Sequence, residues 1–331
     1  MKFNFRFFLL LVCFILQTFC FLNPATASSD LFKPFAISDD VSVMKKLLTY
    51  MSSQESIPWL ELSGYSYSAS SGYIVDDSGF LPSITKAEPL PKKIVLNKDS
   101  VSSERDVSAH ELSEVHHTAK LAIDAGYQNA IQSDIIKTVQ EVEESLPVNH
   151  SSFGVVRDKR SGKIVGSLRA YQGFISADHK LILPSFEILR KRDLLSDRDE
   201  SQLMKNLGSG LYNGQLKAII EVGQFYIDST LTLQERIEVR RQLWIWFTAT
   251  HLNDPASHKM VIAHVSKEVL ARKYKVEYGF DQNIVEKTFQ TDQMQITEKV
   301  LMVSSDKMKS KLLTMINLNP KKLQCSSIFA L

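Results

Sequence analysis

The chain has 331 residues, and its 39 lysines and arginines nearly balance 37 aspartates and glutamates, giving a formal net charge of +2. A charge this close to zero argues against a general nucleic-acid binder, which depends on a large excess of positive charge. The length suffices for one large domain or two small ones, each with an ample hydrophobic core.

Residues 1–27 have the pattern of a cleavable signal peptide. Two basic residues precede an apolar run over residues 7–22, and Ala25-Thr26-Ala27 then offers the small residues that a signal peptidase reads. We expect cleavage before Ser28 and a mature protein that is exported, either to the periplasm or as a secreted protein. The alternative is an uncleaved anchor, although the apolar run is shorter than the roughly 20 residues that a spanning helix needs. No later stretch is apolar enough to cross a bilayer, so no stable membrane anchor is expected after cleavage.

Removal of the signal peptide changes both the charge and the cysteine content. Lys2 and Arg6 leave with it, so 37 basic residues remain against 37 acidic ones. Cys325 is the one cysteine that stays in the mature chain. We therefore expect a neutral protein with no intramolecular disulfide and no cysteine metal site, and no other metal site is predicted.

Residues 28–107 are predicted to form an irregular arm. Serine and glycine are dense between Ser63 and Gly72, and prolines follow at 82, 89 and 91, which breaks both helical and strand periods. The alternative is that a tyrosine cluster of this region, which includes Tyr65, packs over the main domain. Apolar residues recur at helical spacing over residues 108–146, which predicts two helices that separate at Gly126 and end before Pro147.

Strand patterns begin after these helices. Residues 153–157 and 164–171 flank the polar, glycine-containing turn 158–163, which is typical of a β-hairpin. A third strand is expected at Leu181–Leu183 and a charged helix over residues 186–207. Residues 218–227, AIIEVGQFYI, have the composition of a buried strand.

The remaining elements alternate between helix and strand. Thr232 and Glu235 form a capping box that opens a helix. A strand at 260–265, a helix at 266–276 and a last strand at 299–303 follow. The order predicts an α/β fold over residues 108–305, with a mixed central sheet and helices on both faces, and a C-terminal tail over 306–331.

Three stretches in this order resemble the GNAT acyltransferase superfamily. Lys163–Arg169 resembles its second and third strands, and Glu221–Asp228 resembles its central fourth strand. Ala271–Phe280 resembles the end of the helix after its fifth strand, where an aromatic residue precedes Gly-Phe. The resemblance covers roughly residues 110–305 and implies the acyl-CoA N-acyltransferase fold. It also implies an enzyme that moves an acyl group from a thioester donor to an amine.

Within the superfamily, the motifs are most similar to those of acyl-homoserine lactone synthases and related N-acyl amino acid synthases. Gly166 and Arg169 match their third strand, and Glu221 and Asp228 match their fourth. Gln224 stands where those enzymes carry an arginine, so the substrate contacts implied by the resemblance are Arg169 and Gln224.

Acyl transfer from a thioester to an amine needs a base and a proton donor. Glu221 is our candidate base, because the attacking amine must lose a proton either directly or through water. The alternative is a structural carboxylate paired with Arg169. Tyr274 or Tyr278 could protonate the leaving thiolate, and the alternative for both is a packing role.

The cofactor pattern departs from the superfamily. Most members open the helix after the fourth strand with a loop R-x-x-G-x-G/A, whose N–H groups hold the pyrophosphate of coenzyme A. Here the stretch is Arg236–Arg241, with Val239 and Arg241 at the small-residue positions. Its arginines form either a solvated helix face or a charge-based phosphate site. The cofactor-binding candidates are Phe225, Tyr226, Arg236, Arg240 and Arg241, the first two through backbone N–H groups that could hold the oxyanion.

The expected partners are therefore a small-molecule acyl donor and an amine acceptor. No cofactor is expected to bind tightly, and acyl-CoA or acyl carrier protein would act as co-substrate. The alternative from another functional class is a non-catalytic binding protein that kept the GNAT-like fold and lost the pyrophosphate loop. Export favours this alternative, since both of those donors are cytosolic.

Overall fold

The computed structural model describes residues 57–66, 92–95, 104–127, 133–176, 180–201, 219–252, 260–290 and 295–317. The predicted signal peptide and most of the predicted N-terminal arm lie outside these ranges. Within the described ranges, no helix is long and apolar enough to cross a membrane.

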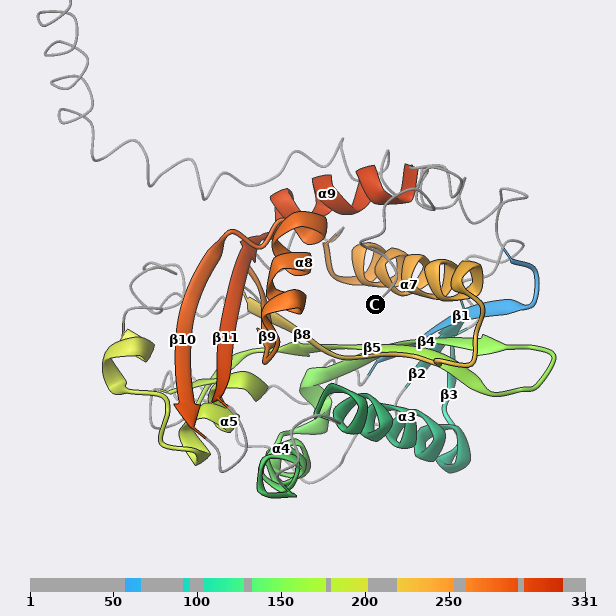
Figure 1. Ribbon diagram of the computed structural model, residues 1–331. Helices are drawn as coiled ribbons and strands as arrows, with labels where there is room; N and C mark the ends of the chain where they lie inside the picture. Colours follow the sequence, from blue (N-terminus) through green and yellow to red (C-terminus); the bar gives the residue numbers. More distant parts are fainter. Residues whose placement is uncertain are drawn as a thin grey trace, which may run out of the picture.

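A large mixed sheet runs through the molecule (Figure 1). Its strand order is β10-β11-β9-β8-β5-β4-β1-β2-β3. The strands are β1 (Leu60–Ser66), β2 (Lys92–Val95), β3 (Glu104–Asp106), β4 (Ser151–Asp158), β5 (Ile164–Gln172), β8 (Ile219–Ile227), β9 (Met260–Val265), β10 (Gln282–Gln290) and β11 (Gln295–Ser304). Neighbours pair antiparallel except β8 and β9, which run parallel. The short strands β6 (Phe174–Ile175) and β7 (Leu181–Ile182) pair separately.

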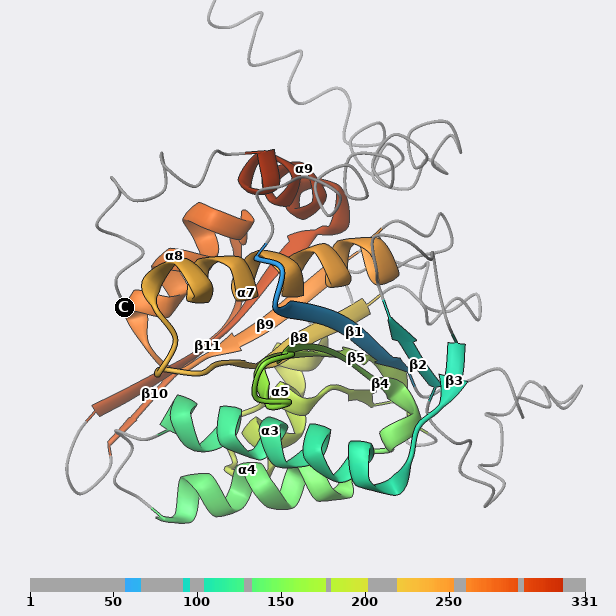
Figure 2. The ribbon, with the colours of Figure 1, turned by 90° about the vertical axis from the view of Figure 1, so that its right-hand side faces the viewer.

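Helices cover both faces of this sheet, as the sequence predicted (Figures 1 and 2). One face carries α3 (Ala109–Tyr127), α4 (Ser133–Ser145) and α5 (Pro184–Lys191). The other carries α7 (Leu233–Phe247), α8 (Glu268–Tyr278) and α9 (Ser305–Asn317). A 3-10 turn, Val148–His150, precedes β4, and a π-helical turn, Thr248–Leu252, extends α7.

Side-chain alternation along the strands builds a core on each face. On β8, Ile220 and Val222 pack under α7, whereas Ile219 packs with the α5 side. Trp246 of α7 fits against two glycines of the sheet: an added Cβ would lie 2.6 Å from its ring at Gly64 and 2.3 Å at Gly154. Glycine is therefore required at both positions for the Trp246 ring to pack against β1 and β4.

The structure corrects both predicted domain limits. The prediction of an irregular arm over 28–107 is wrong for residues 60–66, because these pair with β4 along their whole length and Tyr65 is buried. Residues 92–95 and 104–106 extend the same sheet. The predicted tail over 306–331 is wrong for its first part, since α9 buries Met308 and Leu312 in the core. Residues 318–331 lie outside the described ranges.

Several local predictions are confirmed, and several boundaries differ. The charged helix predicted over 186–207 is wrong in its extent, because α5 ends at Lys191. The hairpin of β4 and β5, the strand at 260–265 and the capping box of Thr232 and Glu235 are present. Helix α3 runs through Gly126 to Tyr127, so the separation from α4 falls later than predicted. Strand β10 was not predicted, and β11 begins before the predicted start at 299.

Candidate active site

The parallel pair β8 and β9 separates in the middle of the sheet. Residues 219–222 of β8 pair with 260–263 of β9, and the pairing ends at Val222. Gln224 then has a positive φ of 49°, and the register between β8 and β5 shifts between Ser167 and Arg169. This is a β-bulge with a non-glycine residue in the left-handed region, a strained geometry that is concentrated at functional sites. Beyond the bulge, β8 stays with β5, and no described strand pairs with its other edge.

Aromatic side chains pack together on the face of the sheet that carries α7 and α8. Phe225 stacks on Trp244 with 6.1 Å between ring centroids, and Trp244 lies 4.4 Å from Tyr278. Tyr274 meets Tyr278 edge-on at 5.2 Å. Burial raises the pKa of Tyr274 to about 12 and also raises the pKa of Tyr278. Tyr278 is 2% exposed, so its surroundings favour the packing role over proton donation.

The arginines of α7 do not form a solvated face. Arg241 pairs with Glu238 at 3.5 Å, and their side chains are 3% and 5% exposed. Arg240 lies 4.0 Å from Glu277 of α8, and both are largely buried. Lys273 of α8, which was not singled out from the sequence, has its pKa lowered to about 8 by burial and by Arg240. Arg236 keeps a buried Nε with no hydrogen-bond partner among the described residues.

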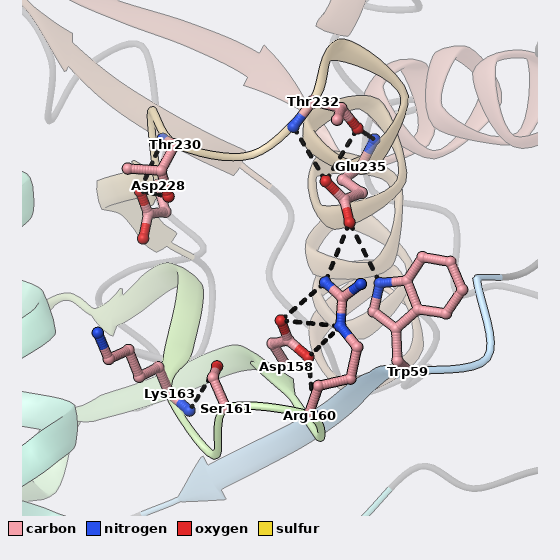
Figure 3. Close-up of polar contacts among 9 residues, drawn as sticks. All are labelled: Trp59, Asp158, Arg160, Ser161, Lys163, Asp228, Thr230, Thr232 and Glu235. Atoms are coloured by element: carbon pink, nitrogen blue, oxygen red, sulfur yellow. Dashed lines mark hydrogen bonds and ion pairs between the residues drawn. The ribbon is translucent and has the colours of Figure 1, made fainter.

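The N-terminus of α7 is occupied by the chain's own carboxylate (Figure 3). Glu235 Oε2 accepts hydrogen bonds from Thr232 N at 3.0 Å and Thr232 Oγ1 at 2.9 Å. Its Oε1 accepts from Trp59 Nε1 and from Arg160 Nη2, both at 3.2 Å. One turn on, Val239 is fully buried, and an added Cβ on Gly166 of β5 would lie 2.3 Å from its Cγ1. The residues at this helix end therefore do not fit a pyrophosphate group.

Glu221 lies on the opposite face of the sheet, beneath α5. Its carboxylate accepts from Ser185 N at 3.1 Å and from Ser185 Oγ at 2.8 Å. The side chain is 3% exposed, and burial raises the pKa of this carboxyl group. Arg169 pairs instead with Glu143 of α4, with Nη2 to Oε1 at 2.9 Å. The alternative prediction, in which Glu221 pairs with Arg169, is therefore wrong. Glu221 is hydrogen-bonded to Ser185, and Arg169 is paired with Glu143.

A second buried acid–base group lies beside Glu221. His264 Nε2 is 3.7 Å from Glu298 Oε2, and Arg192 of the α5 end pairs with the same carboxylate. Burial alone would lower the pKa of His264, but the charges of Glu298 and Glu221 raise it on balance. Burial alone would raise the pKa of Glu298, but His264 and Arg192 lower it on balance.

The positions of these residues follow from strand register. Glu221 is the Cα partner of Ile262, and Ala263 is the last residue of β9 that pairs with β8. His264 therefore follows directly after the point of separation, on the face that carries Glu221. At Gly223, an added Cβ would meet only Arg169 Nη2, at 3.8 Å, among the described residues. Glu221, His264 and Arg169 thus lie on one face beside the bulge, close enough for the charges of His264 and Arg169 to act on Glu221, and the described residues leave room for a Cβ at Gly223.

Sequence reasoning missed Ser185, His264 and Glu298. A histidine within the otherwise apolar strand MVIAHV was the available signal, since a buried polar residue needs a partner. Ser185 offered no local signal. Among the described residues, no group of three or more histidine, cysteine or carboxylate side chains is placed to hold a metal ion.

Comparison with known proteins gives structural matches only. No protein-family model matches the chain, and no curated protein matches it. A GCN5-related N-acetyltransferase from Brucella melitensis matches at 11% identity over 63% of this chain and 80% of its own, with a TM-score of 0.33. An acetyltransferase from Streptococcus agalactiae matches at 7% identity, over 61% and 96%, with a TM-score of 0.29.

A third solved structure is a CoA-dependent acyl-homoserine lactone synthase, MesI. It matches at 12% identity over 59% of this chain and 92% of its own, with a TM-score of 0.29. These scores are low, so the description of the fold rests on strand order and on the separation of β8 from β9. Of the three, the Brucella melitensis protein is named as a GCN5-related N-acetyltransferase.

Proposed function

We propose that the chain is an N-acyltransferase that moves an acyl group from a thioester to an amine. The amine nitrogen attacks the thioester carbonyl carbon, the C–N bond forms and the C–S bond breaks. A base takes the amine proton and the thiolate leaves with a proton from a donor. The observation that carries this proposal is the bulge at Gln224, beyond which β8 has one edge that no strand of the described residues pairs with, beside Glu221 and His264.

The strand edge supplies a place for the donor. A ligand arm that contains amide groups can add to an unpaired strand edge through main-chain hydrogen bonds. The N–H groups of Phe225 and Tyr226 lie in this part of β8 and are the proposed stabilisers of the tetrahedral oxyanion. Phe225, stacked on Trp244, fixes the conformation of this segment.

Glu221 and His264 are the proposed base. The pKa of both groups is raised, which brings the Glu221 carboxyl group toward neutral pH, where a general base is most effective. Because their charges act on each other, their titrations are coupled and the apparent pKa values belong to the pair. Glu221 is held by Ser185 and is hardly exposed, so it receives the amine proton through His264 or through water.

The acceptor amine and the leaving thiolate meet different side chains. Gln224 Oε1 is buried and has no hydrogen-bond partner among the described residues, so we assign it to the acceptor amine. Arg169 borders the open space at Gly223 and contributes positive charge there. Tyr274 is the proposed donor to the thiolate, since Tyr278 is enclosed by Trp244.

Export remains part of the proposal. The sequence pattern of residues 1–27 supports it. Fractionation of the producing cells followed by N-terminal sequencing tests it, and a mature start at Ser28 is the expected result. Protein found uncleaved in the cytosol would contradict export.

A non-catalytic binding protein is the second candidate. It is favoured by the full burial of Trp244 and by the carboxylate of Glu235 at the α7 N-terminus. The two candidates are separated by incubating purified protein with acyl thioesters of several chain lengths and a panel of amines, with product detection by mass spectrometry. An N-acylated amine supports the enzyme, and binding without product supports the binding protein.

A further inference from the structure

We propose that Glu235 is a specificity-determining residue that takes the anion position at the α7 N-terminus and excludes acyl donors carrying a nucleotide diphosphate. The donor is then a thioester bound through its acyl and amide-containing arm alone. That a thioester is the donor rests on the proposed function. The exclusion of a diphosphate is a property of the α7 N-terminus and can be measured without any acyl transfer.

A helix N-terminus attracts anions because its first N–H groups have no partner within the helix and its dipole is positive there. In α7 two of these N–H groups, those of Thr232 and Glu235, find acceptors within the chain. Glu235 accepts from Thr232 N, and Glu235 N donates to Thr232 Oγ1 at 3.3 Å, which completes a capping box. The anion at this helix end is therefore Glu235 itself.

The second oxygen of Glu235 is held from two other parts of the chain. Trp59 comes from the segment before β1, and Arg160 comes from the turn between β4 and β5. The Arg160 guanidinium lies 4.5 Å from the Trp59 ring centroid, and Trp59 O accepts from Lys159 N at 2.8 Å. Because these contacts hold one another, the carboxylate cannot swing away without breaking several bonds at once.

The local charge also opposes a diphosphate. Asp158 bonds the same Arg160 guanidinium through both carboxylate oxygens, at 2.9 to 3.3 Å. Asp228, across the entry to α7, bonds Thr230 (Figure 3). Asp158 and Glu235 thus share one guanidinium group, and an incoming diphosphate would face like charge at close range.

Anion rescue tests this inference. In Glu235→Ala, the Thr232 N–H, the Trp59 indole and Arg160 lose their shared acceptor, and the melting temperature should fall. Inorganic pyrophosphate at about ten times its Kd should then raise the melting temperature of the variant by roughly 2–4 °C. It should leave the wild-type protein unchanged.

Glu268→Ala is the matched control. Glu268 also lies in the first turn of a helix and pairs with Lys299 at 2.8 Å, but it forms no capping box. Pyrophosphate should not stabilise this variant. If Glu235→Ala does not fold, Glu235→Gln removes the charge and keeps a hydrogen-bond acceptor in the same place, and its melting temperature should rise with pyrophosphate by less than expected for the alanine variant but by more than in the wild type.

Two results would overturn the inference. One is a wild-type protein stabilised by pyrophosphate as much as the Glu235 variants, and the other is a Glu235 variant that folds and shows no response. Neither depends on catalysis. Absence of N-acylated product from every thioester would refute the proposed function and would leave the result of the pyrophosphate titration standing.

Discussion

Glu221 of β8 accepts two kinds of hydrogen bond from one residue, the backbone N–H and the hydroxyl of Ser185, at the start of α5. The pair lies fully inside the protein next to the separation of β8 and β9. A buried carboxyl group with two donors from the same residue has a fixed orientation, which a base in acyl transfer needs.

Glu221→Gln should lower the rate of acyl transfer by roughly 10²–10⁴-fold, because it removes the base and keeps the shape of the side chain. Initial rates of N-acyl product formation measure this. Glu268→Ala is the control, since Glu268 lies on the exposed side of α8 and should not alter the rate. An unchanged rate in Glu221→Gln would show that this carboxyl group is structural.

The stability of the same variant should depend on pH. The raised pKa of Glu221 means that the folded protein holds this proton more tightly than the unfolded chain, so its contribution declines as pH rises from about 4.5 to the folded pKa. Glutamine cannot ionise. The melting temperature of Glu221→Gln relative to wild type should therefore increase between pH 4.5 and pH 8. A difference that is constant with pH would contradict the burial of an ionisable group here.

Glu298→Gln should destabilise the protein by about 3–5 kcal/mol, because it leaves His264 and Arg192 without their shared carboxylate inside the sheet. The raised pKa of His264 adds stability that is present below about pH 6.5 and is lost as pH rises through the folded pKa. The lowered pKa of Glu298 adds stability that is lost as pH falls below about 4.5. Urea denaturation at pH 6 and pH 9 should show the larger loss at pH 6.

Gly154→Ala should destabilise the protein by about 1–3 kcal/mol, because the new Cβ would overlap the Trp246 ring. Thermal or urea denaturation measures this change. A stability equal to wild type would mean that Trp246 does not lie against β4 as described.

Gly223→Ala should lower the rate of acyl transfer and leave the stability nearly unchanged. Its Cβ would meet only Arg169 Nη2 at 3.8 Å among the described residues, so the melting temperature should stay within about 1–2 °C of wild type. The methyl group would enter the open space beside Glu221 and should lower acyl transfer about tenfold or more. Wild-type activity in this variant would place the acceptor amine elsewhere.

Local signals in the sequence were enough for part of the fold. The hairpin of β4 and β5 has alternating residues around a glycine turn, and the capping box of α7 needs only Thr232 and Glu235. Strand β1 was missed because its serine and glycine content resembles a loop. Gly64 is there to accommodate Trp246, a contact that becomes visible only when the chain is folded.

The site was harder to predict for the same reason. Glu221 was found because it lies in a recognisable strand motif, but its partner Ser185 is 36 residues away. Trp59 reaches Glu235 across 176 residues. The bulge at Gln224 depends on pairing with β5 on one side and separation from β9 on the other, neither of which a local pattern reports.

A thioester and an amine should react beside the bulge of β8. Mass spectrometry of purified protein with acyl thioesters that lack a nucleotide, such as acyl-pantetheine, and with a panel of amines tests it most directly. Wild-type protein should form an N-acylated product, and Glu221→Gln should form it roughly 10²–10⁴-fold more slowly. No product from the wild type with any donor and amine would contradict it.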